Sequence, residues 1–140
     1  MNMGFTLDQR LADSSDLVSR VGDIQVRLAD DSHYPWLILV PELDNVVELH
    51  DLSDDQRNRL FDLASHLGNW MKTTFSADKI NVATLGNLVP QLHLHVVARQ
   101  NGDPAWPGPI WGHASPTPRT EPNRQELIAA VAGYLETCEI

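Results

Sequence analysis

Polar and apolar residues alternate along 23–28 (DIQVRL), the period-two pattern of a strand with one buried face. After a turn at 30–35, the apolar run 36–40 (WLILV) stops at Pro41, which predicts a central strand. Upstream of both, the apolar residues of 6–21 fall loosely on one side of a helix. We therefore predict a weak helix followed by two strands in the first third of the chain.

The clearest helical pattern covers residues 53–75. Ser53 suits the N-cap position, and Gln56 three residues later completes a capping box. Asp54 and Asp55 then lie at the positive end of the helix dipole. Apolar residues recur at helical spacing and predict one inward, core-forming face, made of Leu60, Leu63, Ala64, Leu67, Met71 and Phe75.

Two more strands are predicted at 79–84 and 92–98, separated by a turn at 85–90. The next segment, 101–122, contains six of the nine prolines and two of the four tryptophans. So many prolines exclude a regular helix or a central strand, while the tryptophans need a surface to pack on. We interpret this segment as an ordered arm.

A C-terminal helix is predicted at 123–135, with Asn123 and Glu126 as its capping pair. From residue 23 on, the order of elements is then strand, strand, long helix, strand, strand, arm and helix. This order predicts an α+β fold: a mainly antiparallel sheet packed with one long and one C-terminal helix. The length of 140 residues favours a single domain over 1–140.

The charge balance limits the classes of partner. Ten Lys and Arg residues against 19 Asp and Glu residues give a formal net charge of −9. This balance argues against nucleic acid and against an anionic membrane as partners. It does not exclude a small phosphorylated ligand, because a local site on an acidic protein can still be neutral or positive.

The single Cys138 excludes an internal disulfide and a cysteine-rich zinc site, and it favours a reducing compartment. We see neither a run of about 18 apolar residues nor a signal peptide at the start of the sequence. A cytoplasmic location is therefore expected.

The candidate chemistry lies in the strand predicted at 92–98. Alternation directs Leu92 and Leu94 to the core and Gln91, His93 and His95 to the opposite face. The two imidazoles would then project side by side, roughly 6.5 to 7 Å apart along the strand. Near neutral pH, one imidazole can attack a substrate as a nucleophile while another donates a proton.

Three other interpretations of this pair stay open on the residues alone. The two histidines can lie on an exposed face, or they can form a metal-binding His-x-His pair. A metal site needs a third ligand, and the candidates are His33, His50, His66 and His113, none at a diagnostic spacing. The third interpretation, a buried pair within the core, is costly without hydrogen-bonding partners. We predict no metal and no cofactor.

Several segments carry a resemblance to a known family. Residues 91–97 (QLHLHVV) resemble the histidine triad motif, His-φ-His-φ-His-φ-φ, with Gln in the first position. Segments in the family's order agree with this match, namely 36–41 (WLILVP), 49–53 (LHDLS), 79–82 (KINV), 86–90 (GNLVP) and 104–108 (PAWPG). The chain is therefore similar to the histidine triad family of nucleotide hydrolases and transferases, over about 21–111.

The resemblance implies a reaction at the α-phosphorus of a nucleotide, such as a nucleoside phosphoramidate or a dinucleoside polyphosphate. His93 corresponds to the nucleophile, which forms a nucleotidyl-histidine. His95 corresponds to the histidine that contacts phosphate oxygens and assists the leaving group. In the family, the backbone carbonyl at the position of Gln91 orients the nucleophile. The resemblance also implies a homodimer.

Further substrate contacts are expected from the same resemblance. Asn87 could donate its amide to a phosphate oxygen, or it could simply be a turn residue. Asp30 lies near the family's ribose-binding acid, although Asp30 and its neighbour Asp31 could both be solvated turn residues. Arg99 matches an arginine that is common after the triad.

The chain also departs from the family pattern. Gln91 cannot act as an acid or a base, and Trp36 replaces a histidine of the second strand. The loop at 81–86 is shorter than usual, so a phosphate contact can be missing. Two classes of function follow: a nucleotide hydrolase, or a nucleotide-binding or interaction protein whose activity is weakened. A nucleotidyltransferase would need an acceptor site that the sequence does not reveal.

Overall fold

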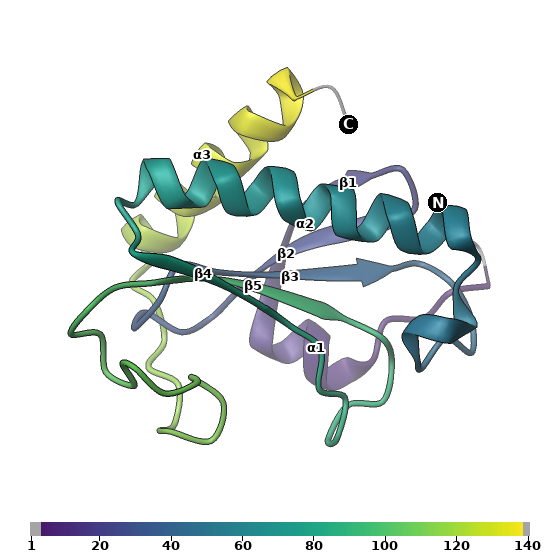
Figure 1. Cartoon of the computed structure of the whole chain (residues 1–140), viewed down its shortest axis with the longest axis horizontal. Coiled ribbons are helices and arrows are strands. Elements are labelled where there is room, and N and C mark those ends of the chain that lie inside the picture. Colours follow the sequence, from purple (N-terminus) through teal and green to yellow (C-terminus); the bar gives the residue numbers. More distant parts are fainter. Residues whose placement is uncertain (1–3, 139–140) are drawn as a thin grey trace.

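A computed structural model describes residues 4–138 as a five-stranded sheet with helices on both faces (Figure 1). The strand order is β1-β2-β3-β5-β4, and each neighbouring pair is antiparallel. The strands are β1 Ser15–Val21, β2 Ile24–Ala29, β3 Trp36–Pro41, β4 Lys79–Ala83 and β5 Leu94–Arg99. The helices are α1 Gln9–Ser14, the 3-10 turn η1 Leu49–Asp51, α2 Asp54–Thr74 and α3 Glu121–Thr137. The predicted α+β class is confirmed.

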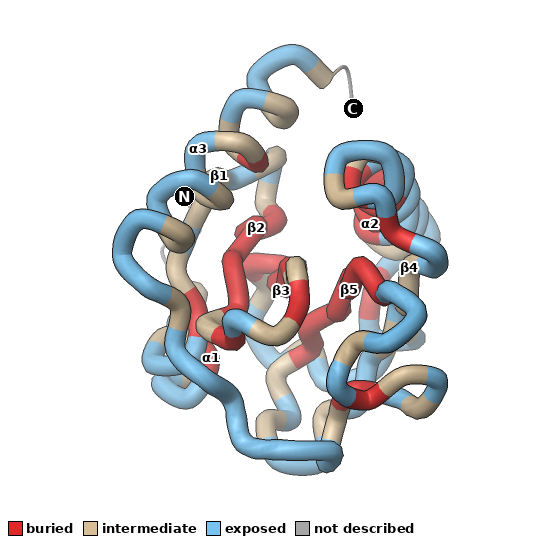
Figure 2. Tube along the Cα trace, turned by 90° about the vertical axis from the view of Figure 1, so that its left-hand side faces the viewer, coloured by how far each residue is buried: buried red, intermediate tan, exposed pale blue. Residues whose placement is uncertain are grey.

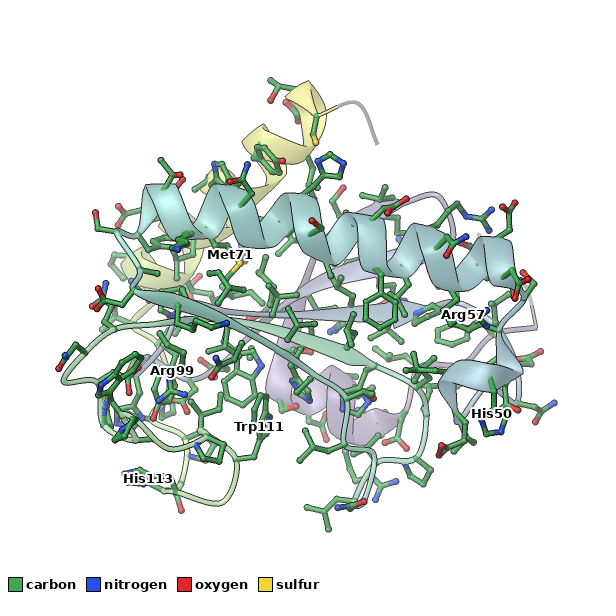
Figure 3. All side chains as sticks on the ribbon, viewed as in Figure 1. His50, Arg57, Met71, Arg99, Trp111 and His113 are labelled. Carbon is green, nitrogen blue, oxygen red and sulfur yellow. The ribbon has the colours of Figure 1, made fainter. Side chains whose placement is uncertain are left out.

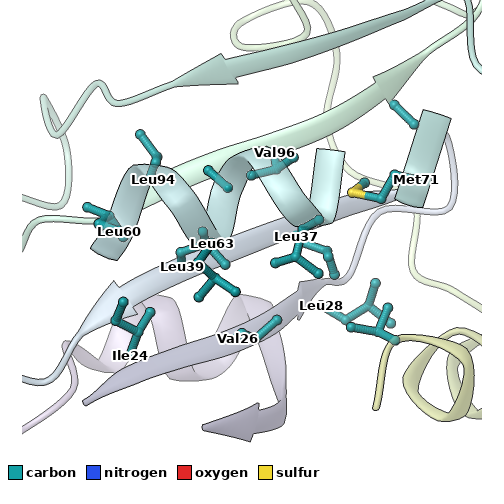
Figure 4. Packing of buried hydrophobic residues seen from close by; sticks show 14 of the residues in the cluster. Ile24, Val26, Leu28, Leu37, Leu39, Leu60, Leu63, Met71, Leu94 and Val96 are labelled. Atoms are coloured by element: carbon teal, nitrogen blue, oxygen red, sulfur yellow. The ribbon is translucent and has the colours of Figure 1, made fainter. Parts of the chain in front are cut away.

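The long helix α2 covers one face of the sheet. Ser53 caps it, and the predicted capping box with Gln56 is present. Leu60, Leu63 and Met71 of α2 pack against inward residues of β2, β3 and β5 (Figure 4). Helix α3 contributes Val131 to the same core. Within 4–138 no helix combines the length and the apolar character that crossing a membrane requires.

The opposite face of the sheet is covered as well. Helix α1 and the segment after β5 lie against it (Figure 1), so strands β2, β3 and β5 are buried along most of their length (Figure 2). Every residue of β2 is buried, which corrects the prediction of a half-buried strand. Its polar residues have partners: the Arg27 guanidinium donates to Ser15 Oγ, at 2.7 Å, and to the Gln25 side chain, at 3.0 Å.

The prediction of a helix over 6–21 is wrong for the second half of this range. Only Gln9–Ser14 is helical, and Ser15–Val21 forms strand β1, paired antiparallel with β2. Gly22 closes this hairpin with φ +58°, a conformation that glycine adopts without strain. Pairing with β2 satisfies the backbone of this segment, and this tertiary effect outweighs a weak helical pattern.

The proline-rich segment 101–122 contacts the rest of the fold at several points. The Ser32 amide donates to the Thr117 carbonyl at 2.7 Å, and the Trp111 ring lies 6.4 Å from that of Trp36. The C-terminal helix begins two residues before its predicted start, and its N-cap is Thr120 instead of Asn123. Pro122 is accommodated because the first turn of a helix does not need its backbone N–H.

Candidate functional site

A cavity of about 580 Å³ opens on the sheet face opposite α2. Its wall combines α1, the end of β2, strand β3, the turn at 85–89, the two triad histidines and the arm. Trp111 lies on this side of the sheet in Figure 3. Segments far apart in the sequence therefore meet at one concave site, as ligand sites commonly require.

His93 lies immediately before β5 and lines the cavity. Its Nδ1 is 2.7 Å from the backbone carbonyl oxygen of Gln91. A carbonyl oxygen can only accept, so Nδ1 of His93 carries a proton and donates it. In the neutral ring, the lone pair is then on Nε2, the nitrogen suited to attack an electrophile.

His95 lies within β5 and also lines the cavity. Its Nδ1 lies 2.9 Å from the indole Nε1 of Trp36, and the Trp111 ring is 5.1 Å from its ring. Burial, together with the nearby charge of His93, lowers the pKa of His95 to about 3. His95 is therefore neutral throughout the physiological range.

The two imidazole centroids lie 4.9 Å apart, closer than the strand spacing predicts. His93 itself lies outside the regular strand, immediately before β5. Each histidine is only 6% exposed, so the interpretation of two exposed histidines is wrong. Their burial is tolerated because the Gln91 carbonyl and the Trp36 indole supply hydrogen bonds.

The structure also bears on the metal interpretation. No cluster of three or more His, Cys, Asp or Glu residues suited to a metal ion occurs within residues 4–138. His33 instead has its Nδ1 2.7 Å from the Asp31 carboxylate.

The Gln91 side chain faces the N-terminal segment and does not line the cavity. Its Nε2 donates to the Thr6 carbonyl at 2.9 Å, and its Oε1 accepts from the Asp8 amide at 2.8 Å. Asp8 is the N-cap of α1. Gln91 thus has two separate roles: its backbone carbonyl accepts a hydrogen bond from His93, while its side chain holds the segment at the start of α1.

This attachment brings Arg10 to the cavity wall. Arg10 donates to the Asp8 carboxylate and, at 2.6 Å, to the Leu88 carbonyl. Sequence reasoning missed Arg10, because its position depends on a contact between residues 83 apart in the chain. Arg10 is the one Lys or Arg side chain that lines this cavity among the described residues.

Asp30 and Asn87, both expected substrate contacts, line the cavity. The Oδ1 of Asp30 accepts from the Arg119 amide at 2.8 Å. Asn87 is exposed and follows Gly86, which has φ +74°. Asp31 lines the cavity too, and its Oδ1 accepts from the Thr117 amide at 3.3 Å.

Arg99 lies outside the cavity, contrary to the expectation that it contacts substrate. Its side chain is 2% exposed and forms an ion pair with Asp103 at 2.8 Å. It also donates to Asn81 at 2.8 Å. Arg99 therefore attaches the arm to the sheet, because its guanidinium is buried and bound to protein groups.

Comparison with known proteins identifies the family. The family model of the HIT domain, the histidine triad domain, matches residues 11–102, which is more than half of the chain. The chain therefore belongs to the histidine triad family.

Solved structures of relatives agree. A histidine triad protein from Marinobacter aquaeolei VT8 is 41% identical, with a TM-score of 0.92 over 96% of this chain and 98% of that one. One from Sinorhizobium meliloti 1021 is 37% identical, with a TM-score of 0.89 over 96% and 97%. One from Bradyrhizobium japonicum is also 37% identical, with a TM-score of 0.89 over 93% and 97%. No protein of curated function matches the chain.

Proposed function

We propose that this protein is a nucleotide hydrolase that attacks the α-phosphorus through a nucleotidyl-histidine intermediate. Proteins of the histidine triad family generally bind or hydrolyse nucleotides. The observation that carries the proposal is the hydrogen bond from His93 Nδ1 to the Gln91 carbonyl. It leaves the Nε2 lone pair of His93 available at the cavity and stabilises the positive charge that attack creates on the ring.

In the proposed first step, His93 Nε2 bonds to the α-phosphorus as the bond to the leaving group breaks. His95 donates a hydrogen bond to a phosphate oxygen through its Nε2. In the second step, water attacks the phosphorus, the bond to His93 breaks, and the nucleoside monophosphate is released. Asp30 is proposed to bind the ribose hydroxyls, and Asn87 a phosphate oxygen.

The glutamine in the first triad position is compatible with this mechanism. The contact to His93 uses a backbone carbonyl, which any residue at position 91 would provide. The competing proposal is a protein that binds nucleotides without turning them over. It is favoured by the absence of a titratable side chain at position 91.

A panel of substrates separates the two proposals. The protein is incubated with nucleoside phosphoramidates, dinucleoside polyphosphates and sugar nucleotides, and the products are identified by mass spectrometry. The hydrolase proposal predicts release of a nucleoside monophosphate that disappears in His93→Ala. Nucleotide binding by calorimetry without any product would support the competing proposal.

We also propose a homodimer that forms through β4. Among the described strands β4 pairs only with β5, so its other edge is unpaired. The Val82 side chain of this strand is 45% exposed. An unpaired edge with an apolar side chain favours pairing with a second copy. Light scattering after size exclusion tests this: a dimer mass is expected, and Val82→Lys should shift it towards the monomer.

A further inference from the structure

The contact between Trp36 and His95 fixes the position of a proton. An indole Nε1–H can only donate, so His95 Nδ1 must accept, at 2.9 Å. The single ring proton of neutral His95 is therefore on Nε2. His93 has the opposite tautomer, because its Nδ1 faces a carbonyl oxygen.

The same contact opposes the charged form of His95. A second proton on Nδ1 would point at the Trp36 N–H, so the ring would lose an acceptor site and face another donor. The Trp36 and Trp111 rings, with centroids 5.6 and 5.1 Å away, also shield the imidazole from water. The other ionisable side chains around the cavity are Arg10, Asp30, Asp31 and His93 among the described residues, and none of them hydrogen-bonds to His95.

We infer that Trp36 is a positioning residue that keeps His95 neutral, with its single ring proton on Nε2. As a consequence, the site favours substrates whose leaving group departs as an anion over substrates whose leaving group is an amine. The inference rests on the proposed hydrolase function and specifies its leaving group.

The electron and proton balance of the first step explains this selectivity. His93 Nε2 forms a bond to phosphorus, and the leaving atom departs with the electron pair of the broken bond. A phosphate or phenolate oxygen accommodates that pair as an anion, whereas an amine nitrogen must receive a proton. Neutral His95 can donate a hydrogen bond, but full transfer of its proton would leave an imidazolate. The Gln91 side chain has no acidic proton to supply.

In the second step the proton balance closes without an acid. A water oxygen bonds to phosphorus, the electron pair of the P–N bond returns to His93 Nε2, and one proton of the water is released to solvent. The anion of the first step leaves to solvent without needing a proton from the protein.

The tautomer of His95 is tested by two-bond ¹H–¹⁵N NMR correlation, without any substrate. The wild-type protein should give the Nε2–H pattern for His95 and retain it at pH 5. Trp36→Phe, which keeps an aromatic ring but removes the donor, should give mixed tautomers and protonation at higher pH. Trp111→Phe is the matched control, because the Trp111 indole also contacts His95 but its Nε1 makes no hydrogen bond. A mixture of tautomers in the wild-type protein would overturn the inference.

The leaving-group selectivity is tested with two substrates that share one nucleoside 5′-phosphoryl group. One carries a 4-nitrophenolate leaving group and the other an alkylamine. Relative to uncatalysed hydrolysis, kcat/KM should favour the phenolate by about 100-fold or more, the usual contribution of a missing general acid. In Trp36→Phe at pH 6, this preference should fall about tenfold or more.

A ratio of two rates within one variant is insensitive to a change in the fraction of folded protein. Equal acceleration of both substrates by the wild-type protein would overturn the inference. Hydrolysis of neither substrate would instead refute the proposed function, and with it the leaving-group selectivity, while the NMR result would still decide whether Trp36 sets the His95 tautomer.

Discussion

At the scale of single residues, the two histidines differ because their hydrogen-bond partners differ. His93 faces an acceptor, the Gln91 carbonyl, whereas His95 faces a donor, the Trp36 indole. These partners give the neutral rings opposite tautomers. The two imidazoles can therefore perform different tasks although they lie 4.9 Å apart on the same wall.

His95→Ala should slow hydrolysis without abolishing it. The variant loses one hydrogen bond to a charged phosphate oxygen, worth about 1.5 to 3 kcal/mol. This corresponds to a loss of roughly tenfold to 150-fold in kcat/KM, measured by steady-state kinetics with an anionic leaving group. Complete loss of turnover in a folded His95→Ala variant would show that His95 does more than donate a hydrogen bond.

At the scale of elements, the Gln91 side chain connects the triad to α1. Its amide is bound to Thr6 and Asp8, so it is not directed at the phosphate. We therefore expect Gln91→Ala to lower kcat/KM by less than about fivefold, below the tenfold effect that about 1.4 kcal/mol produces. Gln91→His should also be tolerated. A loss near a hundredfold in Gln91→Ala would reject a purely backbone contribution at this position.

The arm is attached to the sheet by a buried ion pair. Asp103 accepts two hydrogen bonds from Arg99, and these hydrogen bonds lower the pKa of the Asp103 carboxyl group. Asp103→Asn leaves the Arg99 charge buried without its partner, which typically destabilises a protein by about 3 to 5 kcal/mol. Urea denaturation should show this loss. Glu121→Gln is the control, because its ion pair with Arg124 is exposed and solvent screens it, so its loss should change the free energy of unfolding far less.

Local patterns predicted the elements whose local and tertiary preferences agree. The Ser53 capping box and the apolar stripe of 53–75 gave α2 nearly to the residue, and the run 36–40 gave a central strand. Residues 15–21 were misassigned because pairing with β2 determines their conformation. The start of α3 differs from the predicted one because Pro122 lies within the first helical turn, where a proline is tolerated.

The candidate site was predicted only in part for a similar reason. His93 and His95 follow from a motif within one strand, and Asp30 and Asn87 from positions in matching segments. The Trp36 contact to His95 joins residues 59 apart, and the Gln91 contact to Asp8 joins residues 83 apart. Nothing in the local pattern specifies such contacts. Arg99 pairs with Asp103 of the arm, a partner that the motif does not specify.

At the scale of the whole molecule, His95 should link folding to pH. Its pKa is about 3 in the folded protein and about 6.5 when unfolded, so the unfolded chain binds this proton more tightly. Lowering the pH from about 6.5 towards 3 should therefore reduce the free energy of unfolding, with a slope of up to about 1.4 kcal/mol per pH unit. Above pH 6.5 His95 is neutral in both the folded and the unfolded chain, so it causes no loss of stability there.

Urea denaturation across this pH range measures the slope, and His95→Asn should remove most of it. The Asp103 carboxyl group, whose pKa is lowered, acts with the same sign but only below its unfolded value of 3.8. Between pH 6 and 4.5, above the window of Asp103, the slope therefore reports on His95 without a contribution from Asp103. An identical slope between pH 6 and 4.5 in the wild-type protein and in His95→Asn would contradict the assignment to His95.

The central claim is that His93 forms a bond to the α-phosphorus, and a quenched reaction tests it directly. A substrate that is turned over is mixed with excess enzyme, denatured within the first turnover, digested at alkaline pH and mapped by mass spectrometry. A nucleoside monophosphate attached to the peptide that contains His93, labile to acid and absent in His93→Ala, is the expected result. Turnover with no adduct, or with an adduct on another residue, would contradict the mechanism.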